Sequence, residues 1–401
     1  MIASLYIHVP FCTRKCDYCD FYSVPIGILG NQDRERDALL DSYVERILAD
    51  ARALASRFNV EAIPSIYIGG GTPSLLGAER IYRLLAGLRE LFPPQPQPIC
   101  GRTAHAPREI TVEANPESVD EKFLSACNGG GVSRVSVGIQ SFYEPSRTAV
   151  RRCGALSGAD LEQRLAIVSS HCALFSIDLI SGLPLQTEAV LRSDIERALA
   201  FAPEHVSLYA LTVEKGTALE RNLRRNSCPA LPDADEADAL WLAGRSRLSN
   251  AGYEHYEVSN FSRNGKRCLH NTRYWRMENW LALGPGASGT VIDDKTGTAR
   301  RYAVAADLEN WLTAPRVQEE CLDQRVLMKE TLLMGFRYIE GPDPVLFRSR
   351  FGMGITDAIP KTLTRWGERG CLAETCIALN GEGLLLLNRF LSDAFTEIDS
   401  Q

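Results

Sequence analysis

Residues 65–91 read SIYIGGGTPSLLGAERIYRLLAGLREL and contain both kinds of secondary structure that the fold needs. The stretch begins with an apolar run at residues 65–68, as expected of a short buried strand. Its second half repeats apolar residues at i, i+3, i+4 and i+7, namely Ile81, Leu84, Leu85 and Leu88. That spacing places them on one face of a helix. A strand followed directly by a helix is the repeating unit of α/β proteins.

The same unit recurs along the chain. Five more strand-like runs lie at residues 4–8, 109–113, 134–139, 175–180 and 205–211. Further helical patterns lie at residues 39–58, 119–127, 159–171, 189–201 and 234–250. Strands separated by helices pair in parallel, because a parallel neighbour requires a crossover. Six units therefore predict a partial or full barrel, a (β/α)6 arrangement of the TIM type with right-handed crossovers.

Composition fits an ordinary globular protein. The chain has 401 residues, enough for about two or three domains. A hydrophobic fraction of 45% and a charged fraction of 23% exclude disordered, collagenous and coiled-coil classes. The net charge of −6 argues against bulk binding of nucleic acid.

Neither export nor membrane insertion is expected. The first 12 residues lack a basic region followed by a long apolar run, so we expect no secretory signal. The longest leucine run, residues 384–387, is far short of the roughly 20 apolar residues of a transmembrane helix. We therefore expect a cytoplasmic protein, whose cysteines stay reduced and are available for metal binding or catalysis.

Three regions follow from these patterns: a core barrel at residues 1–250, a barrel-mouth segment with a linker at 251–322, and a C-terminal module at 323–401. Residues 93–107 are rich in proline and read as a surface insertion. Residues 312–323 read as a linker. The module has helical patterns at 324–339 and 356–368, and residues 377–390 predict a hairpin turning at Asn380-Gly381. We expect a small α/β, winged-helix-like module whose basic residues form solvated faces rather than a nucleic-acid site.

Cysteines cluster directly after the first strand. Cys12, Cys16 and Cys19 have the spacing C-x3-C-x2-C. Three thiolates on a short loop can bind three irons of a cubane iron–sulfur cluster and leave the fourth iron open to a ligand. Zinc is the competing metal, although a structural zinc site requires a fourth ligand that is not obvious nearby.

Polar residues and glycines follow the other strands. A run of three glycines after the second strand would let backbone approach a ligand closely. The remaining strands end in or carry Glu113, Gln140, Asp178 and Tyr209. In a parallel barrel the C-terminal strand ends build the active site, so we expect these groups and the cysteines to meet at one mouth.

The cysteine loop resembles that of the radical S-adenosylmethionine (SAM) superfamily. Longer motifs, YIHVPFC at residues 6–12, GGGTPS at 69–74 and IDLISGLP at 177–184, resemble the oxygen-independent coproporphyrinogen III oxidase-like family and its haem-chaperone branch, HemW. The resemblance covers most of the chain and implies a radical SAM barrel with a [4Fe–4S] cluster bound by the three cysteines. By position, it implies that SAM is bound by Tyr6, Gly70, Gly71, Thr72, Glu113, Gln140, Arg152 and Asp178.

Three features favour the chaperone branch over the oxidase branch. The oxidase carries a further cysteine two residues after the third, where this chain has Phe21. The oxidase also carries a long extension before its cluster loop, whereas the first cluster cysteine of this chain is residue 12. Residues 270–275, HNTRYW, match the H-N-x-x-Y-W motif of the chaperones. Other positions depart from the family: residues 151–154 read RRCG and residues 286–289 read GASG, each without the usual histidine.

The resemblance therefore implies a haem chaperone that binds a [4Fe–4S] cluster, SAM and haem and passes haem to respiratory membrane proteins. His270 is the candidate haem ligand, since a neutral imidazole commonly binds haem iron, although a packing role is equally open. Two alternatives remain. One is the oxidative decarboxylase that converts coproporphyrinogen III to protoporphyrinogen IX, and the other is a radical SAM enzyme with a different substrate.

Overall fold

The computed structural model describes residues 1–28, 33–93, 96–99, 102–105, 108–152 and 156–400. Within these residues a single sheet has 12 strands in the order β11-β12-β10-β9-β8-β7-β4-β1-β13-β14-β15-β16. Its centre contains the six predicted strands, which are β1 (Ser4–Val9), β4 (Ser65–Gly70), β7 (Glu109–Ala114), β8 (Arg134–Gln140), β9 (Phe175–Ser181) and β10 (His205–Ala210). Neighbouring pairs among the six are all parallel, as predicted.

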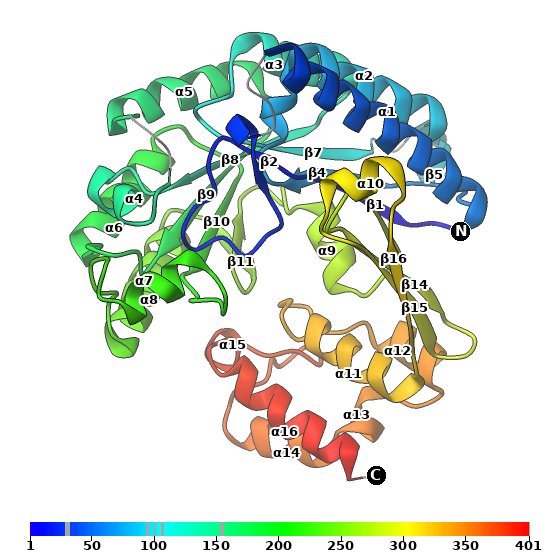
Figure 1. The fold of residues 1–401 in the computed structure, drawn as a ribbon. Coiled ribbons are helices and arrows are strands. Elements are labelled where there is room, and N and C mark those ends of the chain that lie inside the picture. Colours follow the sequence, from blue (N-terminus) through cyan, green and yellow to red (C-terminus); the bar gives the residue numbers. More distant parts are fainter. Residues whose placement is uncertain (29–32, 94–95, 100–101, 106–107, 153–155, 401) are drawn as a thin grey trace.

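Helices cover the outer face of this sheet (Figure 1). They are α1 (Asp33–Arg57), α2 (Gly77–Leu91), α3 (Glu121–Gly130), α5 (Gly158–His171), α6 (Glu188–Leu199) and α8 (Ala234–Asn250). The apolar face predicted for α2 is buried, together with Ile66 and Ile68 of β4, in the main hydrophobic core. On β4 the alternate residues Ser65, Tyr67 and Gly69 are thereby left for the inner face of the sheet.

The sheet curves without closing, so the barrel is partial. At one edge β10 pairs with the antiparallel ribbon β11 (Glu254–Glu257) and β12 (Asn260–Ser262). At the other, β1 pairs with β13 (Trp280–Leu283), followed by β14 (Ser288–Asp293), β15 (Thr298–Val304) and β16 (Val317–Leu322). The linker predicted at residues 312–323 is wrong, because six consecutive residues there pair with β15. The three predicted domain boundaries stay predictions.

The C-terminal module is built from helices, which lie together below the sheet in Figure 1. They are α11 (Gln324–Gly335), α12 (Pro344–Phe351), α13 (Ile355–Ala358), α14 (Pro360–Glu368), α15 (Gly381–Leu385) and α16 (Leu387–Asp399). The predicted hairpin at residues 377–390 is wrong. Asn380 caps α15 by accepting hydrogen bonds from the backbone NH groups of Glu382 and Gly383, a role that an asparagine fills as readily as a turn position.

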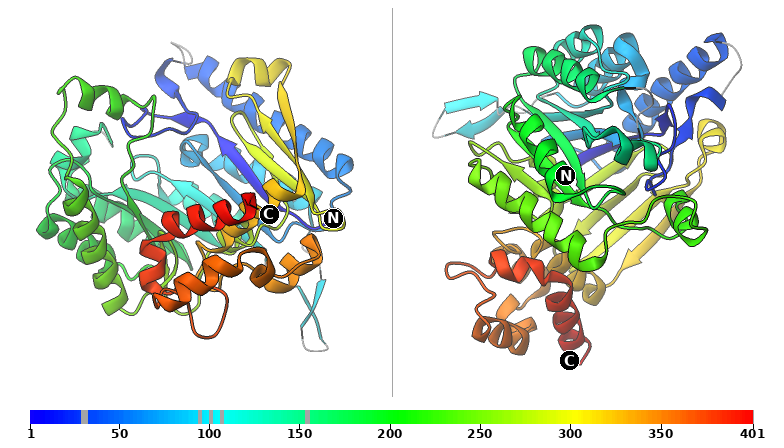
Figure 2. Two further views of the ribbon diagram at one scale, coloured as in Figure 1. Left: turned by 90° about the horizontal axis from the view of Figure 1, so that it is seen from below. Right: turned by 90° about the vertical axis from the view of Figure 1, so that its left-hand side faces the viewer.

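The proline-rich insertion follows α2 and precedes β7. Its described residues form a two-stranded antiparallel ribbon of β5 (Pro96–Ile99) and β6 (Arg102–His105). The ribbon projects from the body of the protein in both views of Figure 2. The structure contains no helix, among the described residues, with the length and apolar character needed to cross a bilayer.

Candidate functional site

A cavity of about 400 Å³ lies at the C-terminal ends of the six central strands. In Figure 1 the blue loop that follows β1 lies over this end of the sheet. Ten of the predicted site residues line the cavity: Cys12, Cys16, Cys19, Gly70, Gly71, Thr72, Glu113, Gln140, Arg152 and Asp178. Tyr209 lines it as well. The strand ends therefore meet at one mouth, as the sequence predicted.

The three cysteines lie on a loop that is held by its backbone. Cys12 ends β2 (Phe11–Cys12), which pairs with β3 (Val24–Pro25). In the middle of the loop, the NH of Asp17 donates to the carbonyl of Val150, and its carbonyl accepts from the NH of Leu219. The loop is thereby tied to two segments that follow β8 and β10.

Burial shapes the chemistry of the thiols. It raises the pKa of Cys12 above its ordinary value and that of Cys19 to about 11. Metal binding by these side chains would therefore release protons. No three histidine, cysteine or carboxylate side chains among the described residues converge on a point that would hold a single metal ion. The three thiols instead share the wall of a cavity large enough for a larger group.

Gly71, directly after β4, is required by close backbone packing. Gly71 donates its NH to the carbonyl of Val9, and Thr72 donates its NH to the carbonyl of Phe11. A Cβ atom at Gly71 would lie 2.6 Å from the Phe11 oxygen, well inside van der Waals contact. This packing brings the Thr72 hydroxyl to 3.6 Å from the Cys12 sulfur.

Two carboxyl groups face the cavity from β7 and β9. Glu113 accepts hydrogen bonds from the Tyr67 hydroxyl (2.8 Å) and the Gly70 NH (3.1 Å). Asp178 accepts from the Ser136 hydroxyl at 3.1 Å. Burial raises the pKa of Glu113 to about 7 and also raises the pKa of Asp178. An approaching cation would shift both groups toward their charged forms.

Gln140 has a strained backbone and an unsatisfied side chain. Its φ of 69° lies in the left-handed region, and the register between β8 and β9 shifts at this residue. Its side-chain Oε1 is buried and has no hydrogen-bond partner among the described residues. Strain and an orphaned polar atom together indicate a group held for a ligand.

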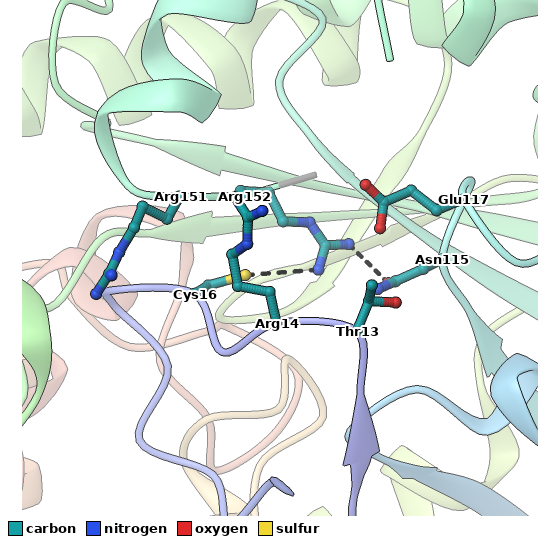
Figure 3. Close-up of a pocket in the computed structure, with 7 residues that line it drawn as sticks. All are labelled: Thr13, Arg14, Cys16, Asn115, Glu117, Arg151 and Arg152. Carbon is teal, nitrogen blue, oxygen red and sulfur yellow. Dashed lines mark hydrogen bonds between the residues drawn. The ribbon is translucent and has the colours of Figure 1, made fainter. Parts of the chain in front are cut away.

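Arg152 connects the cysteine loop with the end of β7. Its Nη2 donates to Asn115 Oδ1 at 2.8 Å, and its Nη1 lies 3.8 Å from the Cys16 sulfur. Figure 3 shows the guanidinium between these two residues. Asn115 also donates from Nδ2 to the Thr72 hydroxyl at 3.1 Å. Asn115 was absent from the predicted site, although its place at a strand end was a usable signal.

Two predicted residues lie outside the cavity lining. Tyr6 is on β1, and its hydroxyl lies 3.0 Å from Nδ1 of His8. His270 is on α9 (Leu269–Trp275). Its ring Nδ1 lies 3.1 Å from the Ser65 hydroxyl, and its backbone NH donates to Oε1 of Glu109 at 2.9 Å.

Ser65 and Glu109 begin β4 and β7, so His270 lies at the floor of the barrel, by which we mean the N-terminal strand ends. It is 8% exposed, and burial lowers its pKa to about 3. The structure therefore does not bring His270 to the mouth.

The donor set fits an iron–sulfur cluster together with a small charged ligand. Three thiols would hold the cluster. The carboxyl groups of Glu113 and Asp178 suit a cationic ligand, the Arg152 guanidinium suits a carboxylate, and the Gln140 oxygen offers an unused acceptor.

Comparisons with known proteins agree with this chemistry. The model of the Radical SAM superfamily matches residues 6–198. Heme chaperone HemW of Mycobacterium tuberculosis is 33% identical over 337 residues, which cover 84% of this chain and 82% of that protein. Heme chaperone HemW of Escherichia coli is 35% identical over 290 residues, covering 72% and 70%.

The chain is also similar to a mitochondrial protein and to one solved structure. The mouse radical S-adenosyl methionine domain-containing protein 1 is 33% identical over 349 residues, covering 84% of this chain and 73% of that protein. The coproporphyrinogen III oxidase HemN of Escherichia coli superposes with a TM-score of 0.76 at 20% identity, covering 98% of this chain and 90% of that one. At that identity the superposition establishes the shared fold.

Proposed function

This chain belongs to the HemW family of radical SAM proteins, and from that premise we propose that it is a haem chaperone. It binds a [4Fe–4S] cluster, SAM and haem, and it delivers haem to respiratory haemoproteins. One observation supports the cofactor part above all others: the three cysteines share a single cavity with Glu113, Gln140, Arg152 and Asp178.

Cys12, Cys16 and Cys19 would hold the cluster. When bound, such a cluster offers an open iron for the amino and carboxylate groups of SAM and an electron for cleavage of its sulfonium bond. The chain supplies placement. The Arg152 guanidinium is placed to bind the carboxylate of SAM. Glu113 and Asp178 are placed near the positively charged groups of SAM, and the Gln140 side-chain oxygen is placed to accept a hydrogen bond from it. The cysteine loop lies over the strand ends, where it would limit contact between bulk water and a bound ligand.

Haem binding rests on the family rather than on a described contact. The names of the relatives call them heme chaperones, and haem is the cargo proposed for this chain. His270 stays a predicted ligand. To reach haem iron it would have to leave its contacts with Ser65 and Glu109.

The oxidative decarboxylase is the second candidate, and the fold shared with the HemN oxidase favours it. Against it, Phe21 takes the place of the additional cysteine of the oxidase branch. The Phe21 side chain is 60% exposed beside the cysteine loop and has no sulfur to offer to any reaction.

A haem titration of anaerobically reconstituted protein tests the proposal. Saturable one-to-one binding, followed by transfer to a haem-free acceptor protein, is the expected result. Conversion of coproporphyrinogen III without saturable haem binding would replace the proposal with the oxidase. Formation of 5′-deoxyadenosine with neither porphyrin nor haem present would instead favour a radical enzyme acting on another substrate.

A further inference from the structure

Three side chains form a column from the floor of the barrel to the cavity. The ring of His270, on α9, lies against the ring of Tyr67, on β4, with centroids 5.2 Å apart. The Tyr67 hydroxyl donates to Oε1 of Glu113, on β7, over 2.8 Å. Because Glu113 lines the cavity, the column connects the H-N-x-x-Y-W helix with the candidate cofactor site.

We propose that Tyr67 and His270 are positioning residues for Glu113. The Tyr67 hydroxyl holds the Glu113 carboxylate toward the ammonium group of SAM, and His270 supports the Tyr67 ring from below. This inference rests on the proposed function, since it requires SAM to bind beside Glu113.

Packing restricts the Tyr67 ring to this one position. Tyr6, its cross-strand neighbour on β1, stacks on it with centroids 6.3 Å apart and an interplanar angle of 29°. A Cβ atom at Gly69 would lie 2.8 Å from both Tyr67 Cε1 and Glu113 Oε2. Glycine at position 69 therefore leaves the space in which the tyrosine and the carboxylate meet.

Each oxygen of Glu113 has a separate donor. Oε1 accepts from the Tyr67 hydroxyl, and Oε2 accepts from the backbone NH of Gly70. Loss of the Tyr67 hydroxyl would leave Oε1 without this donor and free the carboxyl group to rotate. Removal of the His270 ring would leave a gap beneath Tyr67 and loosen the same contact indirectly.

The charge state of Glu113 depends on the same hydroxyl. The groups that face it are Tyr6 on β1, Tyr67 on β4, Asp178 on β9, Tyr209 on β10, and Arg152 after β8. Burial is the main reason that the pKa of Glu113 is raised to about 7, and Asp178 adds to it, whereas Tyr67, the Gly70 NH and Arg152 lower it. Removing the Tyr67 hydroxyl thus raises the pKa further and leaves more of Glu113 neutral at pH 7.

The test is SAM affinity as a function of pH, measured by anaerobic calorimetry on reconstituted full-length protein and normalised to iron content. The variants are Tyr67→Phe, His270→Ala and the double substitution. His205→Ala is the matched control, because His205 is another buried floor histidine whose ring nitrogens bond Ser176 and Tyr256. Glu113→Gln tests the underlying SAM site.

We expect Tyr67→Phe to weaken SAM binding about tenfold near pH 7, the loss of one hydrogen bond to a charged group. The ratio of variant to wild-type affinity should rise with pH as Glu113 ionises in both proteins, and should level off below one because the lost hydrogen bond still leaves the carboxylate less well oriented. This ratio cancels the titration of SAM itself. His270→Ala should weaken SAM binding severalfold and add nothing in the Tyr67→Phe background.

Other outcomes overturn the inference. A loss in Tyr67→Phe that is equal at every pH would show that the hydroxyl does not act on the charge state of Glu113 and would overturn that part of the inference. If the effects of Tyr67→Phe and His270→Ala on SAM affinity are additive, or if His205→Ala weakens SAM binding as much as His270→Ala does, His270 does not act through Tyr67. If the wild type binds SAM and Glu113→Gln weakens that binding while Tyr67→Phe does not, only this inference fails. If the wild type binds no SAM, the proposed function fails with it.

Discussion

The side chain of Asp17 is bound by Arg151, whose Nε lies 2.5 Å from Asp17 Oδ1. The Asp17 side chain is 3% exposed, whereas that of Arg151 is 58% exposed. The second carboxylate oxygen of Asp17, Oδ2, accepts a hydrogen bond from Asn222 Nδ2 at 2.9 Å. The residue directly after Cys16 is therefore a buried carboxylate that ties the cysteine loop to two distant segments.

Asp17→Ala should loosen this loop. We expect a loss of about 2 kcal/mol in the free energy of unfolding, because a buried carboxylate and its two donors are disconnected. Iron content after reconstitution should fall below that of wild type. Glu196→Ala is the control, since Glu196 pairs with Arg247 on the outer helices and both are partly exposed, where such a pair contributes roughly 0–1 kcal/mol. Wild-type iron content in Asp17→Ala would contradict the anchoring role.

Cys12→Ser should abolish cluster binding, because a serine hydroxyl is a poor ligand for iron in a cluster built on thiolates. Iron and sulfide analysis with absorbance spectroscopy would measure it. Cys321→Ser is the matched control, as Cys321 is an exposed residue of the edge strand β16. Iron content unchanged by Cys12→Ser would refute the assignment of the cluster to this loop.

Gln140→Gly should separate stability from binding. Glycine adopts a φ of 69° without the strain of a side chain, so the free energy of unfolding should stay equal or rise by up to about 1 kcal/mol. SAM affinity should nevertheless fall, because the amide facing the cavity is lost. Ala202→Gly relieves a similar φ of 53° at an exposed site and should leave SAM affinity unchanged. Equal SAM affinity in Gln140→Gly and wild type would exclude Gln140 from the site.

His270 should make the protein sensitive to acid. Its folded pKa of about 3 lies below the ordinary value of 6.5, so between these values the unfolded chain binds a proton that the native state does not. Stability is therefore lost as pH falls from 6.5, by up to about 3 kcal/mol at pH 4. His270→Gln should flatten this dependence in denaturant unfolding. Parallel pH profiles for wild type and His270→Gln would show that His270 is accessible in the native state.

Gly381→Ala distinguishes the observed helix start from a hairpin turn. Gly381 is the first residue of α15 and does not have a positive φ. A Cβ atom there would lie 2.5 Å from Nη2 of Arg245; because the end of that long side chain can move aside, alanine should be close to neutral. Asn380→Ala should cost about 1 kcal/mol through loss of the cap. A large loss of stability in Gly381→Ala, measured by thermal unfolding, would contradict the helix.

Local patterns were sufficient for the central strands and for the cavity. Each of the six strands has its own apolar run, and topology then requires their ends to meet. The parts that were missed depend on partners distant in the chain. Asp17 bonds Asn222, residues 317–322 become a strand only through β15, and His270 is placed by Ser65 and Glu109. No spacing of residues along the sequence encodes those contacts. The hairpin was wrongly predicted for a different reason: Asn380-Gly381 suits a helix N-cap and a hairpin turn equally.

The unclosed sheet has a consequence for the size of what the protein can admit. A closed barrel has a circumference set by its strand number and stagger. Here β11 and β16 are the two outer strands, and in the described part of the chain they do not pair with each other. A change in twist can therefore widen or narrow the aperture while every ladder hydrogen bond is kept. Because no closing pair of strands fixes the circumference, the fold itself sets no upper limit on the width of a guest at the strand ends.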